Sequence, residues 1–239
     1  MIILLKFILK NNKCAKLKYQ SIDSSFIPNK LGVNKISIKE TDIEFQNKKL
    51  ITKLNSKKLR EYDNKTDMIV NNRYNGRKKY IKISHLVDSN GAVLTSYIFS
   101  GKCSDFKSVN ETFDKLTIEL NTKKYENNNK YKQYFLADSG YDSKKIHNFF
   151  TQKGYTPVIK PNNRNRKEEN KIFLNKKQWE IYKKRFIVEA SFAWAKHYPV
   201  INQIYEKTIS SYNGLLQLVN SIILSNKIIK DHNMIRNKK

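Results

Sequence analysis

Four polar side chains recur on one face of the segment between residues 182 and 196. If this segment is a single helix, at about 100° per residue, Tyr182, Arg185, Glu189 and Lys196 fall within roughly 60° of one another. Apolar residues fill most of the remaining circumference, so we expect the helix to be buried on most of its surface. A carboxylate there is costly unless it is paired or binds a metal ion. Both an Arg185–Glu189 ion pair, one turn apart, and a metal ligand are consistent with the spacing.

The spacing of these residues also resembles a known signature. Tyrosine, two residues, arginine, three residues, glutamate, six residues and lysine make up the Y-R-E-K pattern of the IS4-like DDE transposases. In that family the glutamate is the third metal-binding carboxylate of an RNase H-like fold, and the other three residues contact DNA near the reacting end. The resemblance therefore implies a catalytic Glu189, three DNA-binding neighbours, and two further aspartates upstream at strand ends.

The first candidate aspartate is Asp23. The alternating, β-branched character of residues 16–27 predicts a strand that ends near Asp23. The block Ile22-Asp23-Ser24-Ser25 is similar to the first-aspartate block of IS4- and IS5-type transposases, which implies a catalytic, metal-binding role. From the residues alone, an Asp-Ser-Ser at a strand end is more often a turn or a cap than a metal ligand.

The second candidate is Asp138, which ends a predicted strand shortly before a glycine that allows a sharp turn. We expect Asp142 or Ser143 to cap the helix that follows over residues 144–152, which leaves Asp138 without an obvious structural role. The string Ala137-Asp138-Ser139-Gly140-Tyr141-Asp142 closely resembles the second-aspartate block A-D-x-G-Y-D of the same families. The resemblance implies that Asp138 is catalytic.

Asp23, Asp138 and Glu189 are distant in sequence but could converge in an RNase H-like fold, where the ends of the first and fourth strands lie side by side. Three carboxylates need positive charge to coexist, and hard oxygen ligands suit Mg²⁺ or Mn²⁺. Two such ions would activate a water or a 3′-hydroxyl and stabilise the leaving oxygen during attack on a phosphodiester. The resemblance thus implies metal-dependent cleavage and transfer of DNA strands.

The predicted elements indicate an α/β fold, a mixed sheet flanked by helices, as in RNase H-like domains. Residues 78–99 predict a hairpin with Asn90-Gly91 at its turn, and we assign Asp88 to that turn. We interpret the polar residues 35–75 as an insertion between the first and second strands. We expect one domain over residues 1–239, with a short apolar helix at its start.

The chain carries 47 Lys+Arg against 21 Asp+Glu, a net charge of +26 spread along its length. Such charge indicates a polyanionic partner, nucleic acid before an anionic membrane surface, although an AT-rich genome also inflates lysine. The loop at residues 161–167 is basic and lacks apolar side chains. Its Arg164, Arg166 and Lys167 are natural phosphate contacts, and a plain solvated loop is equally consistent.

Two cysteines and four scattered histidines form neither a disulfide framework nor a structural zinc site. The apolar start is too short to span a bilayer and lacks a signal-peptide pattern, so we expect an intracellular protein that is not secreted. The family resemblance implies DNA as partner and a homodimer on paired DNA ends. Only 22 residues precede Asp23, so we expect most of the family's N-terminal DNA-binding region to be missing. Two alternatives stay open: an inactive remnant that only binds DNA, and an RNase H-like nuclease.

Overall fold

The computed structural model describes residues 17–28, 70–71, 79–101, 103, 105–116, 132–206 and 208–236. The predicted apolar helix at the start of the chain lies outside these residues. So does the predicted insertion over residues 35–75, except for the two-residue strand β2 (Val70–Asn71).

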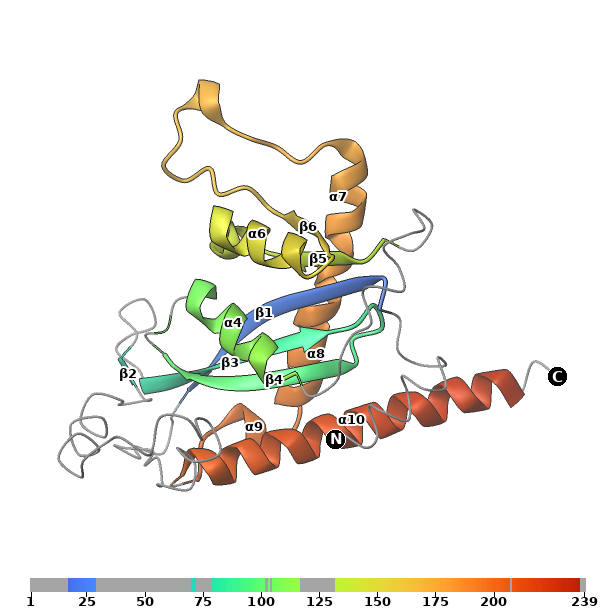
Figure 1. Cartoon of the computed structure of the whole chain (residues 1–239). Helices are drawn as coiled ribbons and strands as arrows, with labels where there is room; N and C mark the ends of the chain where they lie inside the picture. Colours follow the sequence, from blue (N-terminus) through green and yellow to red (C-terminus); the bar gives the residue numbers. More distant parts are fainter. Residues whose placement is uncertain are drawn as a thin grey trace.

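The described strands form one mixed sheet (Figure 1). Its main strands are β1 (Tyr19–Pro28), β3 (Lys79–Val87), β4 (Val93–Ser100), β5 (Tyr134–Ala137) and β6 (Thr156–Ile159). β4, β3 and β1 pair antiparallel, β1, β5 and β6 pair parallel, and β2 adds to β3. The predicted mixed sheet flanked by helices is confirmed, with the first and fourth of the main strands side by side.

Helices cover both faces of this sheet. α4 (Asp105–Asp114) and α6 (Lys144–Gln152) lie on one face, and α8 (Phe186–Lys196) lies on the other (Figure 1). The remaining helical segments are η3 (Ser139–Tyr141), η4 (Glu168–Asn170), α7 (Lys176–Tyr182), η5 (Lys183–Arg185), α9 (Pro199–Asn202) and α10 (Ile209–Arg236). Because the chain turns back after β6 through α7, the helix carrying Glu189 passes close to β1 and β3.

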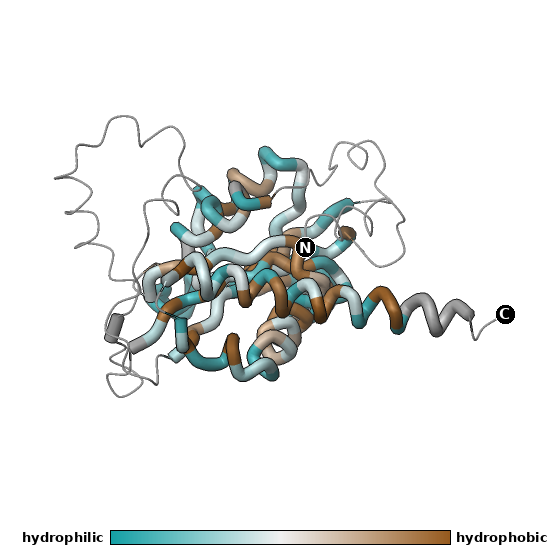
Figure 2. The backbone as a smooth tube through the Cα atoms, turned by 90° about the horizontal axis from the view of Figure 1, so that it is seen from below, coloured by the Kyte–Doolittle hydropathy of each residue, from teal (hydrophilic) through white to brown (hydrophobic). Residues whose placement is uncertain are grey.

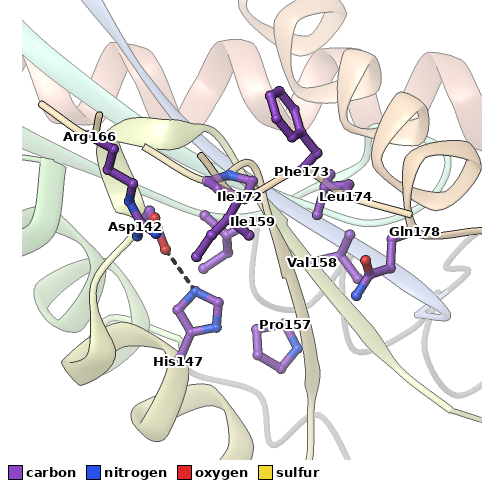
Figure 3. Close-up of a pocket in the computed structure, with 11 residues that line it drawn as sticks. Asp142, His147, Pro157, Val158, Ile159, Arg166, Ile172, Phe173, Leu174 and Gln178 are labelled. Carbon is purple, nitrogen blue, oxygen red and sulfur yellow. Dashed lines mark hydrogen bonds and ion pairs between the residues drawn. The ribbon is translucent and has the colours of Figure 1, made fainter. Parts of the chain in front are cut away.

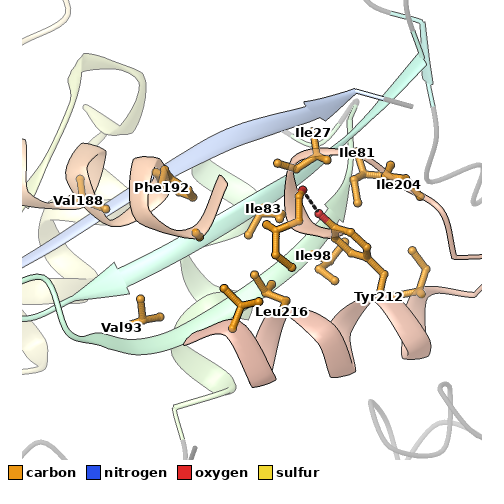
Figure 4. Close-up of a cluster of buried hydrophobic side chains, with 14 of the residues drawn as sticks. Ile27, Ile81, Ile83, Val93, Ile98, Val188, Phe192, Ile204, Tyr212 and Leu216 are labelled. Atoms are coloured by element: carbon orange, nitrogen blue, oxygen red, sulfur yellow. Dashed lines mark hydrogen bonds between the residues drawn. The ribbon is translucent and has the colours of Figure 1, made fainter. Parts of the chain in front are cut away.

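Two apolar clusters hold the layers together. Under α4 and α6 the cluster is rich in aromatic residues, with the rings of Phe135 and Phe150 stacked at 3.4 Å between centroids. Under α8 and α10 it is mainly aliphatic, and the buried Tyr212 hydroxyl donates to the carbonyl of Ile201 at 2.7 Å (Figure 4). Alternate residues of the central strands therefore serve opposite faces, as expected for a sheet buried on both sides.

The long helix α10 crosses the lower side of the molecule, where hydrophobic and hydrophilic residues alternate along its course (Figure 2). Leu216 and Val219 are buried against the sheet, whereas Leu218 and Ile229 are more than half exposed. The helix thus contributes one side to the core.

The predicted hairpin and its turn chemistry are confirmed. β3 and β4 pair from Ile81↔Ser100 to Val87↔Val93. Asp88 Oδ1 accepts the backbone N–H groups of Asn90 at 2.9 Å and Ala92 at 2.8 Å, and Gly91 adopts a φ of 76°. Only glycine adopts that φ without strain, which is why this turn was readable from sequence.

Three expectations about the site segments were wrong. β1 does not end near Asp23 but continues to Pro28, because its antiparallel pairing with β3 runs on to Pro28↔Tyr80. The segment 182–196 is not one helix: α7 ends at Tyr182, and the 3₁₀ turn η5 precedes α8 where the chain passes β1 and β5. α8 is not buried on most of its surface either, since a helix on one face of a sheet buries one side and leaves Phe186 68% exposed.

Candidate active site

Strand register brings the two aspartates together. β1 and β5 are parallel neighbours, with Ser21 opposite Leu136. Two residues further along the same register, Asp23 comes opposite Asp138, which directly follows the last residue of β5. Neighbouring strands lie about 4.8 Å apart. The sheet alone thus brings together two aspartates that lie more than a hundred residues apart in the sequence.

The carboxyl group of Asp23 is largely withdrawn from water, with 19% of its side chain exposed. Oδ1 accepts the backbone N–H of Ser24 at 2.7 Å, and Oδ2 accepts Nη1 of Arg185 at 2.8 Å. Burial raises the pKa of Asp23 to about 6; Ser24 and Arg185 oppose this shift and the charge of Asp138 adds to it. Asp23 is therefore an acid that exchanges its proton near neutral pH.

Arg185 joins two of the candidate acids. While Nη1 donates to Asp23, Nη2 of the same guanidinium donates to Oε1 of Glu189. The ion pair predicted from the i, i+4 spacing is therefore present, and it extends to a strand 162 residues away. Side-chain exposure is 16% for Arg185 and 45% for Glu189, so Glu189 is the solvent-facing acid of the group. One cation thus offsets two carboxylates at the start of α8.

The phenol of Tyr182 completes this side of the site. Arg185 lies 5.7 Å from the centre of the Tyr182 ring, which stacks on Trp179 at 5.5 Å. Burial raises the pKa of Tyr182, the charge of Arg185 lowers it, and the charges of Asp138 and Asp23 raise it further. Tyr182 is consequently within electrostatic reach of both aspartates.

Lys196 fastens the other end of α8 to β1. Its Nζ donates to Ser25 Oγ at 2.6 Å and to the carbonyl oxygen of Phe26 at 3.2 Å, and burial lowers its pKa. Two residues of the sequence signature, Arg185 and Lys196, therefore bind β1 directly. The serines after Asp23 take part as well: Ser25 accepts from Lys196, a contact that sequence reasoning missed although the Asp-Ser-Ser block contained it.

Asp138 has a structural role that sequence reasoning did not assign. Its Oδ1 accepts the N–H of Gly140 at 2.9 Å and so caps η3. Ser143, not Asp142, caps α6 by accepting the N–H of Ile146. The second oxygen of Asp138 has no capping contact in the part of the chain that the structure describes. One carboxylate can thus shape the turn and still present an oxygen to a ligand.

The basic loop after β6 is held in place by hydrogen bonds. Asn163 exchanges two hydrogen bonds with the backbone of Ile172, at 2.7 Å and 3.1 Å, which closes the base of the loop 163–172. Asp142 anchors it to α6 by accepting from the N–H of Asn162 at 2.8 Å and pairing with His147 at 3.1 Å. These anchors hold the exposed side chains of the loop, Arg164, Arg166 and Lys167, on one arm of the molecule.

A pocket of about 250 Å³ opens beside this loop (Figure 3). Asp142, His147 and Arg166 provide its polar side, and the rest is mainly apolar, with Phe173 at 76% exposure on its wall. The pocket lies at the β6 edge of the sheet, between α6 and α7, and contains none of the three candidate acids. It is therefore separate from the site formed by Asp23 and Arg185.

The donor set fits a hard divalent cation in its chemistry, because Asp23, Asp138 and Glu189 all offer carboxylate oxygens. Within the described ranges, however, no three His, Cys, Asp or Glu side chains are close enough together to hold a metal ion. Arg185 stands between Asp23 and Glu189 and supplies the positive charge. Asp23 and Asp138 thus lie near each other where β5 ends, and Glu189 is linked to Asp23 through the guanidinium of Arg185.

Comparison with known proteins assigns the family. Residues 22–219 match the family model described as the transposase DDE domain. The chain belongs to this family. The matched region begins one residue before Asp23 and includes Asp138 and Glu189, so all three candidate acids of this transposase domain fall inside it.

Two solved transposase structures are similar at low identity. A piggyBac transposase synaptic complex with hairpin DNA matches with 9% identity and a TM-score of 0.42, over 96% of this chain and 53% of that chain. A Mos1 transposase paired-end complex with left transposon end matches with 12% identity and a TM-score of 0.31, over 79% of this chain and 59% of that one. The transposase domain therefore spans just over half the length of these chains. A search of curated proteins found no match.

In the described parts of this DDE domain, no helix is both long and apolar enough to cross a membrane.

Proposed function

We propose that this chain is a transposase that cleaves DNA at the ends of a mobile element and joins those ends to target DNA, with Asp23, Asp138 and Glu189 as its catalytic acids. The observation that carries the proposal is the proximity of these acids: the parallel register of β1 and β5, continued by two residues, brings Asp23 opposite Asp138, and Arg185 links Asp23 to Glu189. The family match over residues 22–219 supports the same chemistry.

The three acids would hold Mg²⁺ or Mn²⁺, two ions in all. When bound, the ions activate the attacking oxygen and stabilise the leaving oxygen of the phosphodiester. Burial raises the pKa of Asp23 to about 6 in the metal-free protein, so a divalent ion would compete with the proton for this carboxylate around that pH. Arg185 keeps Asp23 and Glu189 close together by offsetting their charges, and its guanidinium also suits a phosphate of the DNA end.

Basic side chains of the loop after β6 and of α8 would bind the DNA. Arg164, Arg166 and Lys167 are exposed on an anchored loop and so are available to phosphates. An ammonium group has three N–H donors. Lys196 donates two hydrogen bonds, to Ser25 and Phe26, which leaves one N–H for a phosphate. Tyr182, stacked on a Trp179 that is 43% exposed, offers an aromatic surface to a base. Two such chains would pair the two ends of the element as a homodimer.

A strand-transfer assay with an oligonucleotide end and Mn²⁺ tests the catalytic assignment. Asp138→Asn keeps the oxygen that caps η3 but loses the charge, so we expect the rate to fall by about a thousandfold or more. Glu206→Gln, which removes an acid between α9 and α10, should leave the rate within twofold. The absence of any Asp138-dependent activity in the wild-type protein would favour a remnant that only binds DNA, and cleavage without joining would favour a nuclease.

The salt dependence of DNA binding tests the loop. Arg166→Ala should lower the slope of log K against log salt concentration by about 0.9, the value for one lost phosphate contact. Lys230→Ala removes the same charge from an exposed position on α10 and should leave the slope unchanged. Equal slopes for both variants would show that the loop is merely solvated.

A further inference from the structure

His85 is a fully buried histidine that borders the acids without being one of the residues singled out by the sequence. In the antiparallel pairing of β1 and β3 it lies directly opposite Asp23. Paired residues of neighbouring strands project from the same face of a sheet. On that face its ring stacks on Phe192 of α8, with 4.3 Å between centroids and 15° between planes. His85 therefore fills the space between the strand pair that carries Asp23 and the helix that carries Glu189.

The hydrogen bonds around His85 indicate which nitrogen of its ring carries the proton. Ser191 Oγ donates to the carbonyl of Val188 at 2.7 Å, so this hydroxyl can only accept from Nδ1 of His85, 3.3 Å away. The proton of the neutral ring is consequently on Nδ1. Nε2 is a buried lone pair that has no hydrogen-bond partner in the described structure. Burial, with a contribution from Lys196, lowers the pKa of His85 to about 3, which keeps the ring neutral.

α8 is attached to the sheet by polar contacts at three levels. At its two ends, long and flexible side chains make the contacts, Arg185 to Asp23 and Lys196 to Ser25. Between them, the contact is made by the short and rigid imidazole of His85, which both stacks on and hydrogen-bonds to the helix. A buried, planar group between two backbones sets their separation more strictly than an extended side chain does.

We propose that His85 is a positioning residue for the metal centre: by holding α8 through Ser191 and Phe192, it sets the distance between Glu189 and the Asp23–Asp138 pair. The proposal rests on the proposed function, because it assumes that these acids bind divalent ions. The ion bound by the metal centre is Mn²⁺ or Mg²⁺, and His85 affects the affinity for this ion rather than the cleavage and joining of DNA. Groups behind metal ligands typically change ion affinity by about 10- to 100-fold.

Two variants separate the hydrogen bond from the stacking. Ser191→Ala removes the acceptor and leaves the His85 ring in place, whereas His85→Phe keeps a ring against Phe192 but loses the hydrogen bond. Both should raise the Kd for Mn²⁺, measured by titration calorimetry without DNA, by about tenfold. DNA affinity in the presence of a chelator should stay within twofold for both.

Asn220→Ala supplies the matched control. Asn220 is also buried and also links a helix to the sheet, by donating from Nδ2 to Ser96 Oγ at 3.3 Å, but it lies on α10. This variant should lose stability in urea unfolding and bind Mn²⁺ with the wild-type Kd.

The outcomes distinguish the two proposals. If Ser191→Ala and His85→Phe lose stability but keep the wild-type Kd for Mn²⁺, or if Asn220→Ala raises that Kd as much as they do, His85 is a core residue only and the inference is overturned. If the wild-type protein binds no Mn²⁺ in a manner that depends on Asp23 and Asp138, the proposed metal centre itself fails, and the inference fails with it.

Discussion

The helices α8 and α10 join the same apolar cluster on one face of the sheet, yet they contact the strands by different chemistry. α10 packs mainly through aliphatic groups such as Leu216 and Val219, and Figure 4 shows Leu216 pointing into the cluster. α8 adds charged and polar contacts from Arg185, Ser191 and Lys196 along its length. Apolar burial stabilises without direction, whereas hydrogen bonds and ion pairs fix distances and orientations. α10 thus supports the fold, and α8 positions the acids.

The largest expected effect falls on the α10 side of this contrast. Leu216 is fully buried, so Leu216→Ala should lower the free energy of unfolding by about 2–5 kcal/mol. Urea unfolding measures the loss. The Kd for Mn²⁺ of the folded variant should equal that of the wild type. A weakened Mn²⁺ site in this variant would remove the distinction between the two helices.

A smaller effect concerns the proton of Asp23. Its pKa is raised from 3.8 to about 6 in the folded protein, so folding favours the protonated form. The contribution of Asp23 to the free energy of unfolding is fully present below pH 3.8 and is lost as the pH rises to about 6. Asp23→Asn stays neutral at every pH. In the presence of chelator, its free energy of unfolding should therefore rise relative to that of the wild type by about 2 kcal/mol as the pH goes from 4 to 7. Urea unfolding at each pH measures this difference, and parallel pH profiles would contradict a buried, protonated Asp23.

The smallest effect is expected from the cation at the start of α8. Arg185→Gln leaves the carboxylates of Asp23 and Glu189 without their shared partner. Because Glu189 is nearly half exposed, the cost in chelator should be only about 1–2 kcal/mol. A divalent ion can replace the lost positive charge, so Mn²⁺ should raise the Tm of this variant more than that of the wild type. Equal shifts in thermal unfolding would mean that the acids do not bind the ion together.

Local chemistry explains which parts of the fold were predictable. The β3–β4 turn depends on neighbours in sequence: Asp88 accepts the N–H groups of Asn90 and Ala92, and Gly91 supplies the positive φ. Gly91 also shows how tertiary contacts add to this, since a Cβ there would come within 2.8 Å of Trp194 on α8. Trp194 itself is 36% exposed, and Lys227 Nζ lies 3.9 Å from the centre of its ring.

Residue types and spacings alone determined the α/β class, the hairpin and the strand that ends just before Asp138, and they allowed the i, i+4 pair of Arg185 and Glu189 without deciding it. Those features depend on dihedral preferences and on neighbours within a few residues. Only the tertiary structure decided that β1 runs past Asp23, that Arg185 reaches across to it, and that His85 lies between strand and helix. Each of these depends on groups that lie far apart along the chain, and their burial and electrostatic environment exist only once the sheet and α8 have packed together.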